Sequence, residues 1–228
     1  MKAKVITLFT WMFIGFGHSF GQVSLFAGTG TLKGFSSSGK SFYGFNAGIE
    51  LPRSNDMTLY GRIGYYFPRA ESQNYQTYVT AINTSTSPYN LTVNYALKTN
   101  YTTIEGGTRR YIGNDYDNGF SAYGGTNFML IFNSVKRNYE DKDATGTYSW
   151  RDGYQTSATE PDKGNIISIA LGLQGGVKYT IPATGTIFFD VNGQYALLAK
   201  ANNATAQATS QYSPLIFTFT LGFRKDLY

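Results

Sequence analysis

The chain has 228 residues, a formal net charge of +5 and no cysteine; 17% of its residues are aromatic and only 14% are charged. The lack of cysteine excludes disulfide bonds, a thiol nucleophile and a lipoprotein attachment site. The positive charge is mild and the basic residues do not cluster, which argues against nucleic acid as a partner.

Residues 1–21 have the pattern of a secretory signal peptide. A short positive region is followed by an apolar run over 5–16, and small residues stand at the −3 and −1 positions of a cleavage before Gln22. Cleavage there would remove the sole histidine, His18, and two lysines, leaving a charge of about +3. We therefore expect an exported mature domain over 22–228.

The rest of the chain alternates between apolar and polar residues in eight segments bounded by turn-forming residues. Alternation with a period of two predicts β-strands with two different faces. The predicted strands cover 22–31, 41–51, 57–67, 99–112, 119–137, 165–181, 186–199 and 214–224. No segment in this part has the roughly 18 or more continuous apolar residues of a membrane helix.

The connections between these strands alternate in length. The short ones are PRSND, GNDYDN and PATG, and the longer ones are LKGFSSSGK and the stretches 68–98, 138–164 and 200–213. Outer-membrane barrels have short periplasmic turns and longer external loops. The predicted fold class is therefore all-β: a single-domain, eight-stranded antiparallel up-and-down transmembrane β-barrel. Weak alternation within 68–98 also predicts an external hairpin.

A soluble ligand-binding barrel or another secreted β protein is the alternative, because periodicity alone does not say which face is inside. Aromatic residues on the apolar face favour the membrane, since several stand near strand ends as in an interfacial girdle. They are Tyr65, Phe67, Tyr179, Phe189, Phe219 and Phe223.

Three features together resemble the small outer-membrane β-barrel proteins of the Bacteroidota, and are similar in architecture to OmpA- and OmpX-type barrels. They are the signal peptide ending SFG, the eight alternating strands and the closing LIFTFTLGFRKDLY. The resemblance implies location in a bacterial outer membrane, contact with its lipid, and recognition of the last strand by the barrel-assembly machinery. Tyr228 is out of phase with Phe223, so we expect the last strand to end near Arg224, before a short periplasmic tail.

Seven charged residues fall on the face opposite the apolar residues: Glu50, Arg62, Glu105, Arg109, Lys178, Asp190 and Arg224. In an eight-stranded barrel that face surrounds a narrow lumen, where charges must be paired. We expect an ion-pair network that plugs the lumen, with Arg62 paired to Glu50 or Glu105. A charged pore for small solutes is the alternative.

One long loop contains oxygen-bearing side chains at the spacing of a calcium loop. Asp141, Asp143, Thr145 and Asp152 match ligand positions 1, 3, 5 and 12, with a glycine at position 6. The usual glutamate is missing at position 12 and a lysine stands between two ligands, so a solvated acidic loop is the alternative. No other cofactor is indicated.

The mature chain lacks histidine and cysteine, and no spacing suggests a catalytic triad or carboxylate pair. We therefore predict a non-enzymatic structural or accessory barrel. It could be a subunit of a larger secretion or assembly complex of the envelope, held through its external loops. A small-solute outer-membrane pore is the alternative.

Overall fold

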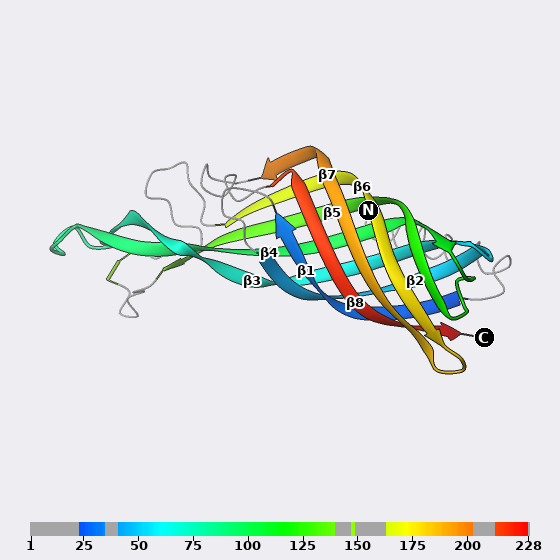
Figure 1. Ribbon diagram of the computed structural model, residues 1–228. Helices are drawn as coiled ribbons and strands as arrows, with labels where there is room; N and C mark the ends of the chain where they lie inside the picture. Colours follow the sequence, from blue (N-terminus) through cyan, green and yellow to red (C-terminus); the bar gives the residue numbers. More distant parts are fainter. Residues whose placement is uncertain (1–22, 35–40, 140–146, 149–162, 203–212, 228) are drawn as a thin grey trace, which may run out of the picture.

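The computed structural model describes residues 23–34, 41–139, 147–148, 163–202 and 213–227. They form eight antiparallel strands that pair in sequence order, and the first strand also pairs with the last to close a barrel (Figure 1). This confirms the predicted fold class. The strands are β1 (Val23–Gly34), β2 (Ser41–Ser54), β3 (Met57–Thr80), β4 (Asn90–Ile112), β5 (Phe120–Tyr139), β6 (Lys163–Ile181), β7 (Gly185–Asn202) and β8 (Leu215–Leu227).

The two ends of the barrel differ (Figure 1). At the turn end, residues 55–56, 113–119 and 182–184 make short connections between strands, and β8 also finishes there. The opposite end, the loop end, carries the long hairpin of β3 and β4. The expected sorting by length holds for the other connections but not for 113–119, which is one residue longer than the loop-end connection 35–40. In the part of the chain that the structure describes, no helix is long and apolar enough to cross a membrane.

Side chains alternate between the lumen and the outer surface, as the pleat of a strand requires. In β3, Tyr60 and Arg62 are buried in the lumen, whereas Ile63 and Phe67 are exposed on the outside. The same alternation makes large apolar side chains the main content of the outer surface; Leu173 of β6, for example, is 68% exposed. The outer surface of the barrel is therefore apolar, whereas the lumen holds charged and polar side chains together with buried apolar ones.

The hairpin of β3 and β4 is longer than the predicted strands, which ended at 67 and began at 99. Its strands pair as far as Thr80 and Asn90, and beyond them Ala81 forms a β-bridge with Tyr148. Val79 and Val93 are buried on one face of the extension. The Tyr, Thr and Asn of this stretch are common in loops, but Tyr and Thr also favour strands, so composition alone did not fix where the strands end.

β8 also runs further than predicted. It continues to Leu227, which pairs with Val23, instead of ending near Arg224 with a tail. Within this extension the Ser24 hydroxyl donates to Asp226 Oδ1 at 2.5 Å. Pairing with β1 satisfies the backbone of 225–227, because an unpaired strand edge leaves its donors and acceptors without partners.

Glycines stand opposite bulky side chains of the lumen. Phe26 pairs with Gly48, and Phe188 pairs with Gly222. A Cβ atom added to Gly48 would lie 2.6 Å from Cζ of Phe26, which is closer than packed atoms approach. Glycine at such positions lets a large side chain cross a narrow lumen.

Candidate functional site

Arg109 lies at the centre of a buried ion-pair network in the lumen. Its guanidinium reaches from β4 to Glu50 of β2 (Nη1–Oε2, 2.7 Å) and to Asp190 of β7 (Nη2–Oδ2, 2.7 Å). All three side chains are at most 1% exposed. Because a planar guanidinium keeps its charge and can bind two carboxylates at once, this one side chain links three strands that are not neighbours in the sheet.

Arg62 of β3 joins the same network from one side. Its Nε is 2.8 Å from Oε2 of Glu105, which stands directly opposite it in the ladder with β4. Its Nη1 is 2.9 Å from Oδ2 of Asp190, so Asp190 accepts from two arginines. Arg62 thus points into the lumen and pairs with one of its two expected partners; the other, Glu50, binds Arg109.

Arg224 of β8 extends the network toward the turn end. Its Nη1 is 3.4 Å from Oε2 of Glu50, and its Nη2 donates to the backbone carbonyl of Tyr116 at 2.6 Å. Its Nε lies 3.4 Å from Oδ1 of Asp226. Tyr116 belongs to the turn between β4 and β5, and burial raises the pKa of its phenol to about 12. Arg224 therefore ties this turn to the barrel wall.

Hydroxyl and amide groups donate to the remaining oxygen atoms of the three carboxylates. The donors are Thr58 and Tyr111 to Glu50, Tyr60 and Asn127 to Glu105, and Tyr123 to Asp190. Burying a charge is costly unless it is both paired and hydrogen-bonded. The charges of Glu50, Glu105 and Asp190 balance those of the three guanidinium groups, and these donors complete the coordination of the three carboxylates.

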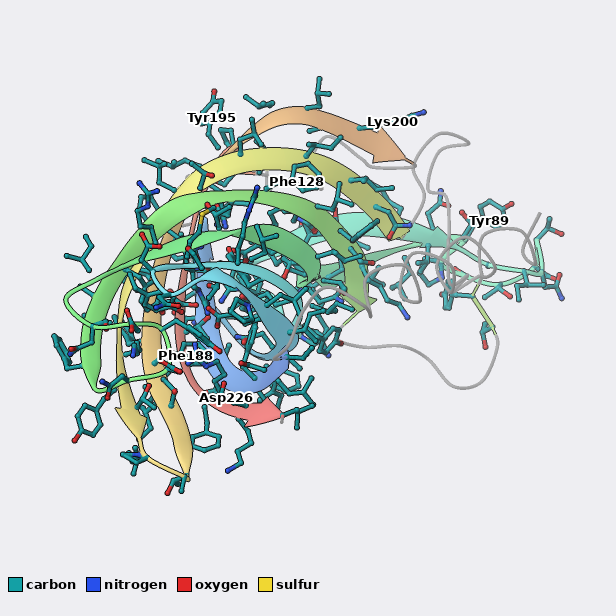
Figure 2. The ribbon with its side chains drawn as sticks, turned by 90° about the vertical axis from the view of Figure 1, so that its right-hand side faces the viewer. Tyr89, Phe128, Phe188, Tyr195, Lys200 and Asp226 are labelled. Atoms are coloured by element: carbon teal, nitrogen blue, oxygen red, sulfur yellow. The ribbon has the colours of Figure 1, made fainter. Side chains whose placement is uncertain are left out.

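Aromatic rings surround the guanidinium of Arg109. Its Cζ lies 4.6 Å from the centre of the Tyr60 ring and 5.0 Å from that of Tyr123. The rings of Phe26 and of Phe188, a lumen residue labelled in Figure 2, lie at 5.5 Å and 5.4 Å. Such contacts favour a cation that has lost its water. The rings of Phe26, Tyr60 and Phe188 also pack together as a buried cluster inside the barrel.

An apolar layer closes the lumen on the loop-end side of the network. Its buried members come from all eight strands: Leu32, Phe42, Tyr66, Tyr101, Met129, Ile131, Ala170, Ala196 and Ile216. Eight strands give an interior only wide enough for side chains. The lumen therefore has two successive barriers, one charged and one apolar.

The comparisons with known proteins agree with this architecture. No protein-family model matches the chain, and no curated protein matches its sequence. A major outer membrane protein from Thermus thermophilus has a similar structure, with a TM-score of 0.51 and 10% identity over 90% of this chain and 98% of that one. The fold is that of a small outer-membrane β-barrel.

Two further structures match with lower TM-scores. Ail, the attachment invasion locus protein of Yersinia pestis, matches at 0.45 with 13% identity, over 90% of this chain and 99% of that one. Neisserial surface protein A matches at 0.43 with 17% identity, over 90% of this chain and 97% of that one. At such identities the likeness concerns the fold and not the function.

Lys178 lies outside the ion-pair network of the barrel, contrary to expectation. Its Nζ donates to the backbone carbonyls of Asp115 (2.7 Å), Asn118 (2.6 Å) and Gly119 (3.3 Å), all in the turn between β4 and β5. Within the described ranges it forms no salt bridge. Carbonyl oxygens can satisfy a buried ammonium as carboxylates do, and this turn folds under the lumen close enough to supply them.

The predicted calcium ligands Asp141, Asp143, Thr145 and Asp152 lie outside the described residues. Among the residues that are described, no group of three or more His, Cys, Asp or Glu side chains is placed to hold a metal ion. The calcium loop stays a prediction.

Most of the uncharged residues of the network were not among the predicted site residues. Tyr111 stands two positions after Arg109, and Phe188 two positions before Asp190, so both share the inward face of a charged neighbour. The same period of two that identified the charged residues could have found them. Asp226 was missed because β8 was expected to end before it.

Proposed function

We propose that this protein is a non-enzymatic, integral outer-membrane barrel with a closed lumen, which presents its loop-end hairpin to protein partners in the envelope. The closed network around Arg109 carries this proposal. The network occupies the lumen and stabilises the barrel there. The hairpin and the loops are therefore the surfaces that remain available for recognition.

The outer surface supports insertion in a membrane. Large apolar side chains such as Phe45 (58% exposed) and Ile63 (61% exposed) repeat along the outside of the strands. Soluble monomers rarely expose contiguous apolar surface of this extent. The outer membrane is the compartment in which closed barrels of this type span the bilayer.

The lumen supports a closed barrel over the alternative of a pore. Glu50, Glu105 and Asp190 are each bound to an arginine, so none is free to act as a base or to line a wet channel. A buried arginine removed from its carboxylate would be strongly unfavourable. Ion or solute passage would require this network and the apolar layer to open together.

The hairpin supports a role in recognition. It projects beyond the barrel wall at the loop end (Figure 1), with Tyr89 near its tip (Figure 2). Tyr78, Ile82 and Tyr89 are all exposed there. Tyrosine offers a large contact area at a small cost in conformational entropy, which makes it common at protein interfaces.

Planar-bilayer conductance tests the closed lumen. We expect the reconstituted protein to give no large, stable channels. The variant with Arg109→Ala and Met129→Ala, which shortens one side chain in each barrier, should conduct more often. Large reproducible channels from the unaltered protein would instead support the small-solute pore.

Affinity capture from detergent-solubilised outer membranes tests the recognition role. The comparison is between the unaltered barrel and a variant with Tyr78→Ser, Ile82→Ser and Tyr89→Ser. Proteins captured by the first and lost with the second would be partners of the hairpin. A barrel that runs alone in both forms would count against a complex subunit.

A further inference from the structure

Lysines occupy three neighbouring positions of the ladders that join β4, β5 and β6 near the loop end of the barrel. Lys98 of β4 is directly opposite Lys136 of β5, and Lys136 is directly opposite Lys163 of β6. The side chains of Lys98 and Lys136 are exposed. We call these three positions the lysine row. Like charges directly opposite each other in a ladder are unfavourable, so the arrangement needs an explanation.

No carboxylate in the described part of the chain forms a salt bridge with Lys98 or Lys136. The turn end offers a contrast. There the exposed Arg110 has a carboxylate neighbour, with its Nε 3.8 Å from Oδ2 of Asp56. Among the residues that the structure describes, the lysine row is therefore a local excess of positive charge, and an anion from outside the chain would relieve it.

From the lysine row toward the middle of the barrel, the outward side chains become less polar from one row to the next. Asn100, Ser134 and Asn165 face one another across the same three strands, and the next row contains Thr102, Phe132 and Ile167. Phe132 and Ile167 are exposed, and the wall below them is apolar. Successive outward residues are about 7 Å apart along a strand, so charge, amide or hydroxyl, and apolar side chains follow one another over about 14 Å of strand, from the headgroup region into the hydrocarbon.

This order matches a phosphorylated lipid in the membrane. We propose that the lysine row binds the phosphate of a lipid headgroup, with Asn100 and Ser134 toward the headgroup's hydroxyl or ester groups. The acyl chains then lie along Phe132 and Ile167. Lys200 of β7, which Figure 2 shows on the outside of the wall, is directly opposite Ile167 and adds positive charge at the edge of this surface. Lysine binds phosphate as a point charge and needs no rigid geometry.

The inference rests on the proposed membrane location and adds a defined lipid site to it. A soluble partner of the same charge would not account for the apolar rows directly below the lysines. A lipid accounts for the whole sequence of rows, because its phosphate and its chains are joined in this order.

The test uses the purified full-length barrel in detergent micelles and native mass spectrometry to measure bound lipid. The probes are dioleoyl phosphatidic acid, dioleoylphosphatidylcholine and inorganic phosphate. The test variant is Lys98→Gln with Lys136→Gln. The matched control is Arg53→Gln with Arg110→Gln, which removes two exposed positive charges from the turn end.

We expect the unaltered barrel to prefer phosphatidic acid to phosphatidylcholine. The test variant should bind phosphatidic acid roughly 30-fold more weakly, and the control should be unchanged. Equal binding of both lipids, no effect of the test variant, or an equal loss in the control would overturn the lipid site. Binding of inorganic phosphate as tight as that of phosphatidic acid would also overturn it, because a free-anion site needs no acyl chains.

Insertion into dioleoylphosphatidylcholine vesicles separates this inference from the proposed function. A barrel that inserts but shows no lipid preference contradicts the lysine row as a lipid site and leaves the membrane location standing. A barrel that does not insert contradicts both.

Discussion

Arg109 and Asp190 are 81 positions apart in the sequence, yet their side chains meet inside the barrel at 2.7 Å. They come from β4 and β7, which are not neighbours in the sheet. The pair therefore depends on closure of the barrel and acts across the lumen. Its partners, Glu50 and Arg62, bring β2 and β3 into the same network.

Replacement of Arg109 should destabilise the barrel more than replacement of any surface cation. Arg109→Met would leave Glu50 and Asp190 buried with fewer compensating charges, and we expect the free energy of unfolding to fall by about 3–5 kcal/mol. Urea unfolding in phosphatidylcholine vesicles, followed by the gel mobility of unheated samples, measures this change.

The adjacent Arg110 provides the control for that experiment. Its side chain is 73% exposed and its ion pair with Asp56 lies in solvent, so Arg110→Met should change stability by no more than about 0.5 kcal/mol. Equal stability of the two variants would show that the network contributes nothing beyond a surface ion pair.

The glycine pair at 175 and 176 offers a test of lumen packing. Gly176 faces inward, and a Cβ added there would lie 2.6 Å from both Cζ and Oη of Tyr123. Gly175 faces outward, where the nearest atom to an added Cβ is the carbonyl oxygen of Tyr123 at 3.7 Å. We expect Gly176→Ala to lower the free energy of unfolding by about 1–3 kcal/mol through overpacking, and Gly175→Ala to be nearly neutral.

The same vesicle-based unfolding assay compares these two variants directly. Their substitutions are chemically identical and adjacent in sequence, so differences in strand propensity cancel. A larger loss for Gly175→Ala than for Gly176→Ala would mean that the inward and outward faces of β6 are assigned the wrong way round.

The part of the site that could be predicted follows from the alternation of side chains between the two faces of each strand. A period of two assigns the seven predicted charged residues to the lumen, and pairing of consecutive strands brings Arg62 opposite Glu105. Contacts across the lumen, such as Arg109 with Asp190, depend on how far each strand is shifted along its neighbour around the whole barrel. One strand's sequence does not contain that shift.

Lys178 shows a second limit of sequence reasoning. Its inward position follows from the alternation of side chains along β6, but its partners are backbone carbonyls of a turn. Every residue has a carbonyl, so residue types give no sign that a turn will fold under the lumen and aim three of them at one ammonium. The length of the β3–β4 hairpin was uncertain for a related reason, because its side chains suit both loops and strands.

The turn between β2 and β3 provides a pH-dependent prediction outside the barrel wall. The Ser54 hydroxyl donates to Asp56 Oδ1 at 2.7 Å, and this hydrogen bond holds the pKa of Asp56 below its ordinary value of 3.8. A carboxyl pKa that is lowered in the folded state stabilises the fold above the unfolded pKa, and this contribution is lost as the pH falls through the folded pKa. We expect Ser54→Ala to raise the pKa of Asp56 toward 3.8.

Carboxyl-carbon NMR of protein labelled at aspartate can follow that titration in micelles. Arg110→Gln is the comparison, since Arg110 is a smaller cause of the shift than Ser54. A larger change in the Asp56 pKa with Arg110→Gln than with Ser54→Ala would contradict the assignment of the hydrogen bond as the main cause.

Lys178 should keep the turn between β4 and β5, residues 113–119, well ordered. Lys178→Met keeps the length of the side chain but removes the donor to Asp115, Asn118 and Gly119. Three partly buried hydrogen bonds to carbonyl groups then lose their charged donor, and we expect a loss of about 1.5–3 kcal/mol in the free energy of unfolding. Faster hydrogen exchange within 113–119 should accompany it, because the turn loses its main link to β6.

Lys225→Met is a suitable control, since Lys225 donates to carbonyls of the other turn, Ala183 and Thr184, from an exposed position. Unchanged exchange in 113–119 after Lys178→Met would show that the other links of the turn hold it in place, namely Arg224 to the carbonyl of Tyr116 and the backbone hydrogen bonds to Asn55 and Thr180.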